Sequence, residues 1–567
     1  MKRTYLLLFL FLPLFNAYSA EETVQYPLRF DRYYTYEEVN EALEVLNKKH
    51  PSLTKLEKVG LSDEGRAIYA LTINNPATGK AEDKPGIYVD GNIHGNEIQA
   101  GEVCLYLANY LLTKYESNQQ ISQLLDRVTF YILPVVNVDG RWHFFNDANT
   151  PSTNRSIRRQ QDDDKDGLFD EDAYDDLDGD GNICQMRIKD PDGLYKTSDE
   201  DARLLQRIEP GEKGEWTLLG YEGIDNDGDG RFNEDAEGYL DPNRNWPFGW
   251  YPDFIQSGAG EYPLSGTGLH AVANYIEARK NILMVWAFHN SGGMFLRGPS
   301  ASDLVVPQAD IKVYDLLGKN AEKMVPGYKY MPSYELYPTH GDFGEFTYNL
   351  MGAYTFVGEL FQVESETFNK EGKAETDREK RESERISFND YLAHGELYKP
   401  WTAYEHPVYG SIEIGGWVKM SSRLPHPYML PDLVHRNAAA VIYSAMQLPE
   451  VEMELIDQQR MSGNIHKIRV RLRNTKGISS MSMHSWQKKL YTPDQLIVEG
   501  ADVLAGGKIE NLYTNQVLYK EYLPHIQFTR IDGFSKVEYE FIVEGKGEIN
   551  IRFISVKAGS QQLKVNL

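Results

Sequence analysis

The sequence predicts an α/β domain with a mixed, largely parallel sheet flanked by helices, followed by a C-terminal all-β sandwich-like domain. Up to residue 447, apolar runs of strand length alternate with helical stretches, which is typical of buried strands joined by helical crossovers. From residue 448 on, apolar and polar residues alternate with a period of two, which indicates strands with one buried face. We therefore expect the two domains to cover residues 20–447 and 448–567.

The elements of the first domain follow from these runs in chain order. A polar lead-in over 24–80 contains one amphipathic helix, over 36–49. A second helix over 98–114 joins the first two strands, and a closing helix covers 438–446. The strands are predicted over 86–90, 128–136, 282–288 and 354–360.

Two segments interrupt this alternation. An insertion over 160–240 is rich in Asp and Gly, and a run of mixed charges over 366–390 is interpreted as a solvated loop or a short helix. In the second domain the period-two segments lie at 466–472, 537–543 and 549–553, with Gly and Asn turns nearby. A sandwich of roughly 110–120 residues fits the usual size of a domain.

The chain begins with the pattern of a signal peptide. Lys2 and Arg3 precede an apolar run over 5–15, and Ala-Tyr-Ser at 17–19 forms a cleavage site. The apolar run is too short to span a bilayer comfortably, so we expect residues 1–19 to be removed and not to anchor the protein. No cysteine follows that site to accept a lipid, and no later stretch is long enough to span a membrane. The expected location is therefore secreted or periplasmic, with no membrane span.

Charge and cysteine content narrow the possible roles. The formal net charge of −25 repels phosphate backbones, so a nucleic-acid partner is not expected. Cys104 and Cys184 are the two cysteines of the chain. In an exported protein they could form a disulfide, or they could be two buried free thiols, because sequence does not place their Cα atoms.

A histidine and a glutamate stand where a strand gives way to a helix. His94 and Glu97 follow the apolar run that ends at Asp90. An isolated H-x-x-E pattern is weak evidence, but active sites of α/β sheets gather at the carboxyl ends of strands. Catalytic zinc takes three N or O ligands and keeps one position open. His289 ends a fully apolar run and supplies a candidate third ligand, whereas the chain has no H-E-x-x-H motif.

With these motifs the sequence resembles the zinc carboxypeptidase family that includes pancreatic carboxypeptidase A, over about residues 30–445. The resemblance implies a carboxypeptidase-like fold and one catalytic Zn²⁺ bound by His94, Glu97 and His289, a His₂Glu set that is documented for carboxypeptidase A. It also implies a secreted hydrolase that acts on a peptide or protein with a free C-terminus. Such an enzyme is a metalloprotease that hydrolyses the last peptide bond of its substrate.

The same resemblance assigns roles to residues outside the proposed zinc site. Asn-Arg-Ser-Ile-Arg-Arg at 154–159 resembles the segment with the oxyanion-stabilising arginine, which falls on Arg158. Asn243 and Arg244 match the pair that binds the terminal carboxylate of the substrate, and Tyr337 matches the mobile tyrosine that covers it. Glu359 lies on the strand that carries the general base. The planar fork of Arg244 suits a carboxylate better than a lysine would.

The substrate's side-chain preference stays open at this point. Gly344 falls near the position that sets specificity in the family, and it departs from both the apolar and the basic pattern. Asp342 and Glu345 stand beside it and could favour a terminal Lys or Arg, or they could face solvent.

The Asp-rich insertion contains three D-x-D-x-D-G stretches. Alternate carboxylates with a glycine at the sixth place let a loop surround a hard cation with oxygen ligands. The first stretch has Ala173 where an EF-hand has its twelfth-position Glu, so these loops resemble the shortened calcium loops of dockerin or thrombospondin repeats. A disordered acidic loop is the alternative. The expected structural Ca²⁺ ligands are Asp162, Asp164, Asp166, Asp176, Asp178, Asp180, Asp225, Asp227 and Asp229.

Two alternative functions remain open from the sequence. A related zinc enzyme could cut muropeptides of the cell wall at the same site. A degenerate carboxypeptidase fold could instead serve as a non-catalytic, calcium-dependent binding protein, although the proposed zinc ligands and Glu359 are all present. The C-terminal β-domain carries no pattern that indicates chemistry.

Overall fold

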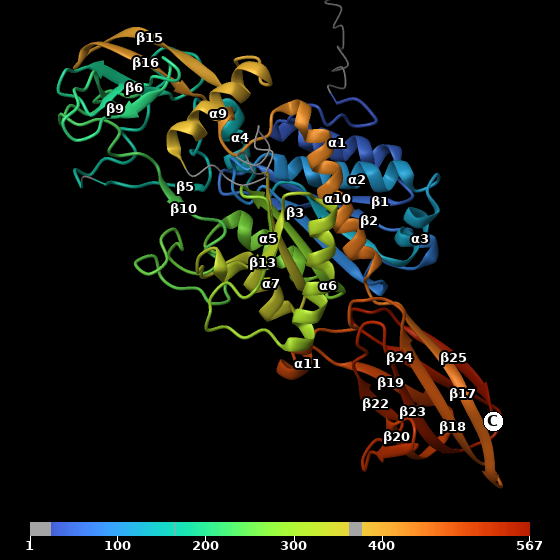
Figure 1. Cartoon of the computed structure of the whole chain (residues 1–567). Helices are drawn as coiled ribbons and strands as arrows, with labels where there is room; N and C mark the ends of the chain where they lie inside the picture. The colour runs from blue at the N-terminus through green and yellow to red at the C-terminus, as the bar shows by residue number, and fades with distance from the viewer. Residues whose placement is uncertain (1–23, 164, 362–376) are drawn as a thin grey trace, which may run out of the picture.

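The first domain is built on one mixed sheet of eight strands (Figure 1). The computed structural model describes residues 24–163, 165–361 and 377–567, so the expected signal peptide lies outside the described residues. The strand order is β1-β2-β4-β3-β11-β14-β12-β13. Their bounds are β1 Thr54–Leu61, β2 Ala67–Ile73, β3 Gly86–Gly91, β4 Thr129–Leu133, β11 Ile282–Asn290, β12 Met294–Arg297, β13 Lys329–Pro332 and β14 Tyr354–Leu360.

The centre of this sheet is parallel, as predicted. Strands β4, β3, β11 and β14 run in the same direction, and every residue of β3, β4 and β11 is buried. The prediction for the lead-in was incomplete, because β1 and β2 form an antiparallel edge there. Most residues of β1 are only partly buried, so its sequence lacks the apolar run that marked the inner strands.

Helices cover this sheet, and α1, α2 and α10 overlap the three that the sequence predicted, whereas most of the others were not predicted. The helix α1 starts with a capping box between Thr35 and Glu38. The helix α2 packs on β3, β11 and α10, whereas α5 packs on β1 and α7 on β14. The closing helix α10 begins at Leu430, earlier than predicted, with a proline in its first turn. The described α-helices of this domain are α1 Tyr36–Lys49, α2 Gln99–Lys114, α3 Gln119–Arg127, α4 Val138–Asn146, α5 Thr267–Glu277, α6 Gln308–Met324, α7 Phe343–Met351, α9 Arg378–Tyr391 and α10 Leu430–Met446, and the short 3-10 helices are η1 Pro76–Thr78, η2 Ala81–Asp83, η3 Ser333–Glu335, η4 Lys419–Ser421 and η5 Pro427–Met429.

The Asp-rich insertion folds into more than loops. It supplies four strands of a six-stranded sheet of order β15-β16-β6-β9-β7-β8, whose other two strands come from 398–417. A separate ribbon pairs β5 with β10 and joins the insertion to the first domain. The bounds are β5 Ile157–Arg159, β6 Gln185–Lys189, β7 Tyr195–Thr197, β8 Leu205–Arg207, β9 Trp216–Tyr221, β10 Gly238–Leu240, β15 Tyr398–His406 and β16 Gly410–Trp417.

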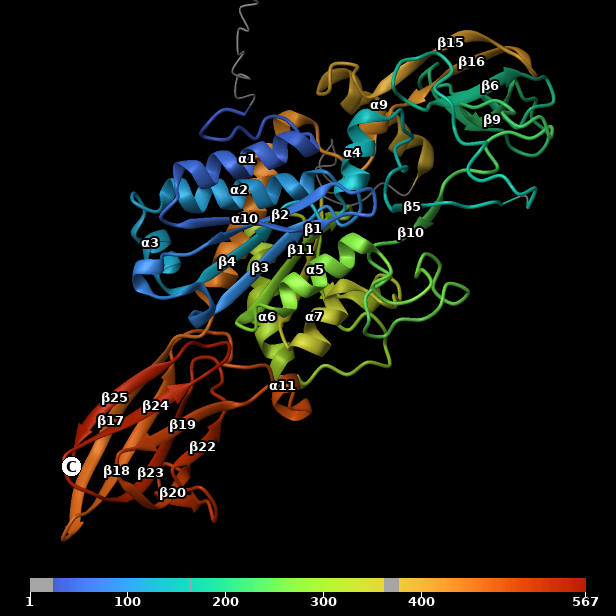
Figure 2. The same cartoon turned by 180° about the vertical axis from the view of Figure 1, so that it is seen from behind.

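The C-terminal module is built on strands, as predicted; these strands are antiparallel, and one short helix, α11, accompanies them. One sheet has the order β17-β18-β23-β20-β21 and the other β22-β19-β24-β25, and buried residues from both form one core. Figure 2 shows this module at the opposite end of the molecule from the sheet that contains β6 and β15. The bounds are β17 Val451–Ser462, β18 Ile465–Asn474, α11 Met483–Lys488, β19 Asp494–Glu499, β20 Asp502–Asn511, β21 Gln516–Tyr519, β22 Ile526–Thr529, β23 Lys536–Glu544, β24 Glu548–Ile554 and β25 Gln561–Asn566.

Two further sequence questions receive an answer from the structure. Cys104 and Cys184 are both buried and both free, so the two thiols do not form a disulfide. Among the described residues, no helix is both long enough and apolar enough to span a membrane.

Candidate functional site

The candidate site lies where neighbouring parallel strands end. His94 and Glu97 are in the turn that follows β3, and His289 is near the end of β11. Glu359, near the end of β14, lies beside His289 because the two residues are paired in the register of β11 and β14. The carboxyl ends of parallel strands share one sheet edge, so residues far apart in the chain meet there.

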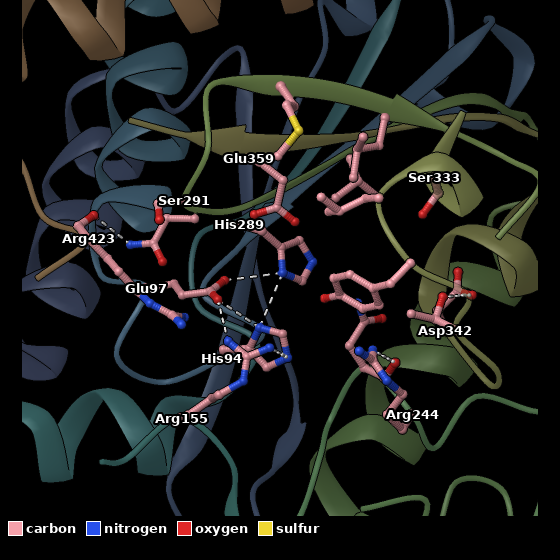
Figure 3. Close-up of a pocket in the computed structure, with 18 residues that line it drawn as sticks. His94, Glu97, Arg155, Arg244, His289, Ser291, Ser333, Asp342, Glu359 and Arg423 are labelled. Atoms are coloured by element: carbon pink, nitrogen blue, oxygen red, sulfur yellow. Dashed lines mark hydrogen bonds and ion pairs between the residues drawn. The ribbon is translucent and has the colours of Figure 1, made fainter. Parts of the chain in front are cut away.

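Two imidazoles and one carboxylate converge in a buried cluster (Figure 3). The Nδ1 atoms of His94 and His289 are 3.3 Å apart. His94 Nδ1 lies 2.9 Å from Glu97 Oε1, and His289 Nδ1 lies 3.1 Å from Glu97 Oε2. All three side chains are at most 3% exposed. Burial alone would raise the pKa of Glu97, but the adjacent His94 and His289 hold it well below its usual range.

This donor set fits one zinc ion. Two nitrogen ligands at about 2.0–2.1 Å from a tetrahedral zinc lie about 3.3 Å apart, which is the separation of the two Nδ1 atoms. Glu97 Oε2 is buried and faces His289 Nδ1, so a cation bound between the two side chains would take the place of that contact. A buried carboxylate with two imidazoles is also the chemistry that catalytic zinc prefers.

Asp241 orients the first of these imidazoles and was not identified from the sequence. Its Oδ1 lies 3.1 Å from His94 Nε2, on the side of the ring away from Glu97. Burial opposes ionisation of Asp241, but His94, with smaller effects of Arg244 and Arg155, holds its pKa below the usual range. A carboxylate at the distal nitrogen of a ligating histidine fixes the tautomer and increases the basicity of the ligand.

Glu359 lines the same cavity but is not part of the cluster. Burial and the negative charge of Glu97 raise the pKa of Glu359 to about 7, although His289 acts in the opposite direction. A carboxylate with a pKa near neutrality can accept and release a proton at physiological pH. This property suits a general base.

The structure places Arg155 and the predicted Arg158 in different surroundings. Arg155 Nη1 donates to Glu97 Oε1 over 2.8 Å, and its Nη2 lies 3.1 Å from His94 Nε2. The guanidinium of Arg158 instead bonds Asp147 and Asn154 and lies 3.0 Å from Glu237. The structure therefore places Arg155 beside the cluster, whereas the predicted Arg158 lines a neighbouring cavity.

The residues predicted to bind the substrate carboxylate all line the cavity. Arg244 is only 9% exposed, and among the ion pairs of the described residues none includes it. Asn243 accepts a hydrogen bond from Phe343 N through its Oδ1, so its amide NH₂ is left for another partner. Tyr337 is 50% exposed and stands at the rim.

The cavity measures about 450 Å³ and continues past these groups. Its wall contains apolar side chains, namely Met294, Leu296, Leu336 and Val357. Asp342 also lines it, caps α7 through Glu345 N and accepts a hydrogen bond from Thr339 Oγ1. Burial and the charge of Asp342 raise the pKa of Glu345 to about 7. Of the residues near the specificity position, Asp342 faces the cavity and Gly344 does not line it.

Arg423 is a further residue of the cavity that sequence reasoning missed. It comes from the loop before α10, and its carbonyl accepts hydrogen bonds from the side chains of Gln99 and Asn290. Its backbone has a φ of 62°, which is a left-handed conformation. No motif marks this residue, because only the packing of distant segments brings it to the cavity.

The Asp-rich loops curl in the way the spacing predicts. Asp162 accepts hydrogen bonds from Lys165 N and Gly167 N, and Asp225 accepts them from Gly228 N and Gly230 N. Three groups of acids among the described residues lie close enough to share a cation. Asp164, one of the predicted calcium ligands, lies outside the described residues. The groups are Asp166, Glu171 and Asp227; Asp176, Asp178 and Glu222; and Asp225, Asp227 and Asp229.

Comparisons with known proteins give matches to both parts of the chain. A family profile described as zinc carboxypeptidase matches residues 39–374, and one described as a domain of unknown function matches 450–566.

Carboxypeptidase D of Homo sapiens is 36% identical over 110 residues, which are 19% of this chain and 8% of that protein. Carboxypeptidase B of Astacus astacus is 34% identical over 115 residues, which are 20% of this chain and 36% of that protein. The chain therefore spans much less than two thirds of either relative. Carboxypeptidase A from Helicoverpa armigera aligns with a TM-score of 0.45 and 16% identity, over 74% of this chain and 75% of that one.

Proposed function

Because the chain belongs to the zinc carboxypeptidase family, we propose that it is a secreted or periplasmic metallocarboxypeptidase that removes the C-terminal residue of peptides or proteins. The observation that carries this proposal is the cluster of His94, Glu97 and His289 in one cavity with Glu359 and with Arg244, which forms no ion pair among the described residues. The signal-peptide pattern of the first nineteen residues supports export.

The residues that would hold zinc are His94, Glu97 and His289, with Asp241 orienting His94. When bound, zinc supplies Lewis-acid chemistry that makes water more acidic and polarises a carbonyl group. Glu359 accepts a proton from the attacking water and delivers it to the leaving amine. Its pairing with His289 in the sheet register supports this role, because His289 is one of the proposed zinc ligands.

Arg244 and Arg155 bind two different negative charges of the substrate. Arg244 binds the terminal carboxylate through its planar fork, assisted by Asn243 and by the hydroxyl of Tyr337. This contact limits cleavage to the last peptide bond, since only a chain end has that carboxylate. Arg155, beside Glu97, stabilises the negative charge that develops on the carbonyl oxygen, a role that the sequence assigned to Arg158.

The Asp-rich insertion takes structural calcium in this proposal. Its loops curl around their first aspartates, and its acids form groups with the spacing of cation ligands. The insertion joins the first domain through the ribbon of β5 and β10. Along the chain, Arg155 comes shortly before β5, and Asp241 follows β10 directly. Calcium therefore supports the segments that carry these two residues.

The test combines metal content with product analysis. Purified protein is expected to hold about one zinc per chain and to release a free amino acid from peptides ending in Phe, Leu, Lys, Arg or Glu, but not from their C-terminal amides. Glu359→Gln should keep zinc and lose roughly 10²–10⁴-fold in kcat. The matched control is Glu396→Gln, since the Glu396 side chain is 69% exposed. Zinc retention without release from any peptide would contradict the enzymatic proposal, and release from muropeptides alone would favour a cell-wall substrate.

A further inference from the structure

What we call the loop pair consists of the described residues of the first and third Asp-rich loops of the insertion, 162–163 with 165–172, and 225–235. Asp172 and Asp235 make an antiparallel bridge, in which Asp172 N donates to the Asp235 carbonyl oxygen over 3.3 Å. Asn226 Nδ2 donates to Asp172 Oδ1 over 3.0 Å, and Asp163 N donates to Asp235 Oδ1 over 2.8 Å. Each loop thus ends on an aspartate that is held by the other loop.

Carboxylates of the two loops also face each other. Glu171 lies against Asp235 and near Asp166, and Glu234 lies in the equivalent way against Asp172 and near Asp229. The arrangement is therefore reciprocal: the glutamate of each loop approaches an aspartate of its own loop and the buried aspartate of the other loop.

The two bridging aspartates are buried and incompletely bonded. Asp172 is 0% exposed and Asp235 is 1% exposed, and the Oδ2 atom of each has no hydrogen-bond partner among the residues that the structure describes. Both carboxylate oxygens of Glu171 and the Oε2 of Glu234 are buried without a partner as well. Buried carboxylates that face one another are strongly unfavourable while both are ionised, unless a cation joins them; the alternative is that they share a proton.

No side chain supplies that cation within the described part of the chain. The ion pair of Arg231 with Asp229 spans 3.8 Å, and the arginine side chain is 69% exposed. None of the ion pairs formed by described residues includes Asp172, Asp235, Glu171 or Glu234. The middle loop differs, because the ammonium of Lys399 pairs with Asp178 and lies 2.6 Å from Asp180.

We propose that the loop pair binds two calcium ions between its two loops and that the middle loop, neutralised by Lys399, binds none. One ion is held by the group of Asp166, Glu171 and Asp227 with Asp235, and the other by Asp225, Asp227 and Asp229 with Glu234 and Asp172. Calcium accepts six to eight oxygen ligands in flexible geometry, which suits such a dense set of carboxylates. The inference rests on the proposed binding of calcium by the insertion and adds four ligands that the D-x-D-x-D-G spacing does not contain.

The location of the loop pair connects it to catalysis. Ala173 and Tyr174 follow Asp172 directly, and residues 236–239 follow Asp235. All of them line a cavity of about 750 Å³. Arg155 and Arg244 line both this cavity and the cavity of the proposed zinc site. The two ions therefore fix one wall of a groove that leads to the proposed zinc site, where upstream residues of a peptide would lie.

The test titrates full-length, zinc-loaded protein with calcium chloride, after dialysis into calcium-free buffer that contains zinc. Calorimetry is expected to give two calcium ions per chain. The double variant Asp172→Asn with Asp235→Asn should weaken calcium binding by roughly 10–100-fold. The matched control Asp178→Asn should change neither the stoichiometry nor the affinity. Calcium should lower KM for a long peptide in the wild type and leave the zinc content unchanged.

Thermal melting separates ligand loss from misfolding. Without calcium, the double variant should melt at a higher temperature than the wild type, because the amides remove the repulsion of buried carboxylates. With saturating calcium the order should reverse. Three ions per chain, a loss of one ion in Asp178→Asn, or unchanged binding in the double variant would overturn this inference while leaving calcium binding in place. No calcium binding at all would overturn both, and the carboxypeptidase proposal would be judged separately by zinc content and turnover.

Discussion

Replacing Arg244 by methionine is expected to abolish the preference for a free C-terminus. The Arg244 guanidinium lines the catalytic cavity, is 9% exposed and forms none of the ion pairs among the described residues. A peptide carboxylate placed there would receive two parallel N–H donors from a largely desolvated cation. Methionine retains much of the side chain's length and removes only the charged fork.

The magnitude follows from the number of charge-assisted hydrogen bonds. Each is worth about 1.5–3 kcal/mol, and loss of one partner of a buried charged pair costs about 2–5 kcal/mol. We take about 3–5 kcal/mol for the whole contact, and about 1.4 kcal/mol corresponds to a factor of ten in kcat/KM. The Arg244→Met variant should therefore lose between about 10² and 10⁴ in kcat/KM on a peptide with a free carboxylate.

The assay is a cycle between enzyme and substrate. Wild type and Arg244→Met are each tested on one tripeptide and on its C-terminal amide, and the coupling between the arginine and the carboxylate is obtained from four values of kcat/KM. The wild type should prefer the acid by roughly the predicted factor, and the variant should lose most of that preference. Arg423→Met is the matched control, because Arg423 lines the same cavity and the proposal gives it no role in binding the carboxylate. Equal preference for the acid in wild type and Arg244→Met would refute the reasoning, as would loss of the preference in Arg423→Met.

Four further outcomes are expected. Arg155→Met should lower kcat by roughly 10²–10³-fold, whereas Arg158→Met should lower it less than tenfold, and the opposite order in steady-state kinetics would return the oxyanion role to Arg158. Asp241→Asn should weaken zinc binding by roughly 10–100-fold in a competition titration, and unchanged affinity would remove Asp241 as a support of His94. The value of kcat/KM should fall as pH decreases through the pKa of Glu359, because the base loses its ionised form. That pKa is raised to about 7, and bound zinc would lower it. An acid limb of the pH profile centred well above pH 7 would therefore count against Glu359. Burial lowers the pKa of Lys557 to about 7, so between about pH 7 and 10 the unfolded chain binds more protons than the folded chain. The free energy of unfolding should therefore rise with pH in that range. Lys557→Met should reduce this rise in urea unfolding, and the same pH dependence in the wild type and the variant would contradict the prediction.

Much of the zinc site was predictable because its signals are local. His94 and Glu97 follow a buried strand directly, and His289 ends another, so the edge shared by parallel strands brings them together. The apolar runs themselves specified β3, β11 and β14, since fully buried strands have few polar residues. The period-two pattern of the C-terminal module was informative for the same reason: each of its sheets has one buried face.

The arginine beside the proposed zinc site was not decided by its motif. Arg155 and Arg158 lie three residues apart in the same Arg-rich segment, and the sequence favoured Arg158. The ribbon of β5 and β10 holds Arg158 against Asp147 and Glu237, while Arg155 precedes the ribbon and reaches Glu97. A long side chain binds whichever carboxylate the surrounding chain presents, and that depends on tertiary packing.

The sequence alone was enough for the fold class and the acidic loops, because periodicity and local spacing encode both. The three side chains of the proposed zinc site were predicted from their places at strand ends together with the resemblance to the zinc carboxypeptidase family. Tertiary structure was needed for Asp241, for Arg423 and for the contact between Asp172 and Asp235. Each of these depends on segments that approach one another across long stretches of chain. Hydrogen bonds and charge interactions act over a few ångströms in space, and separation along the chain does not report that distance.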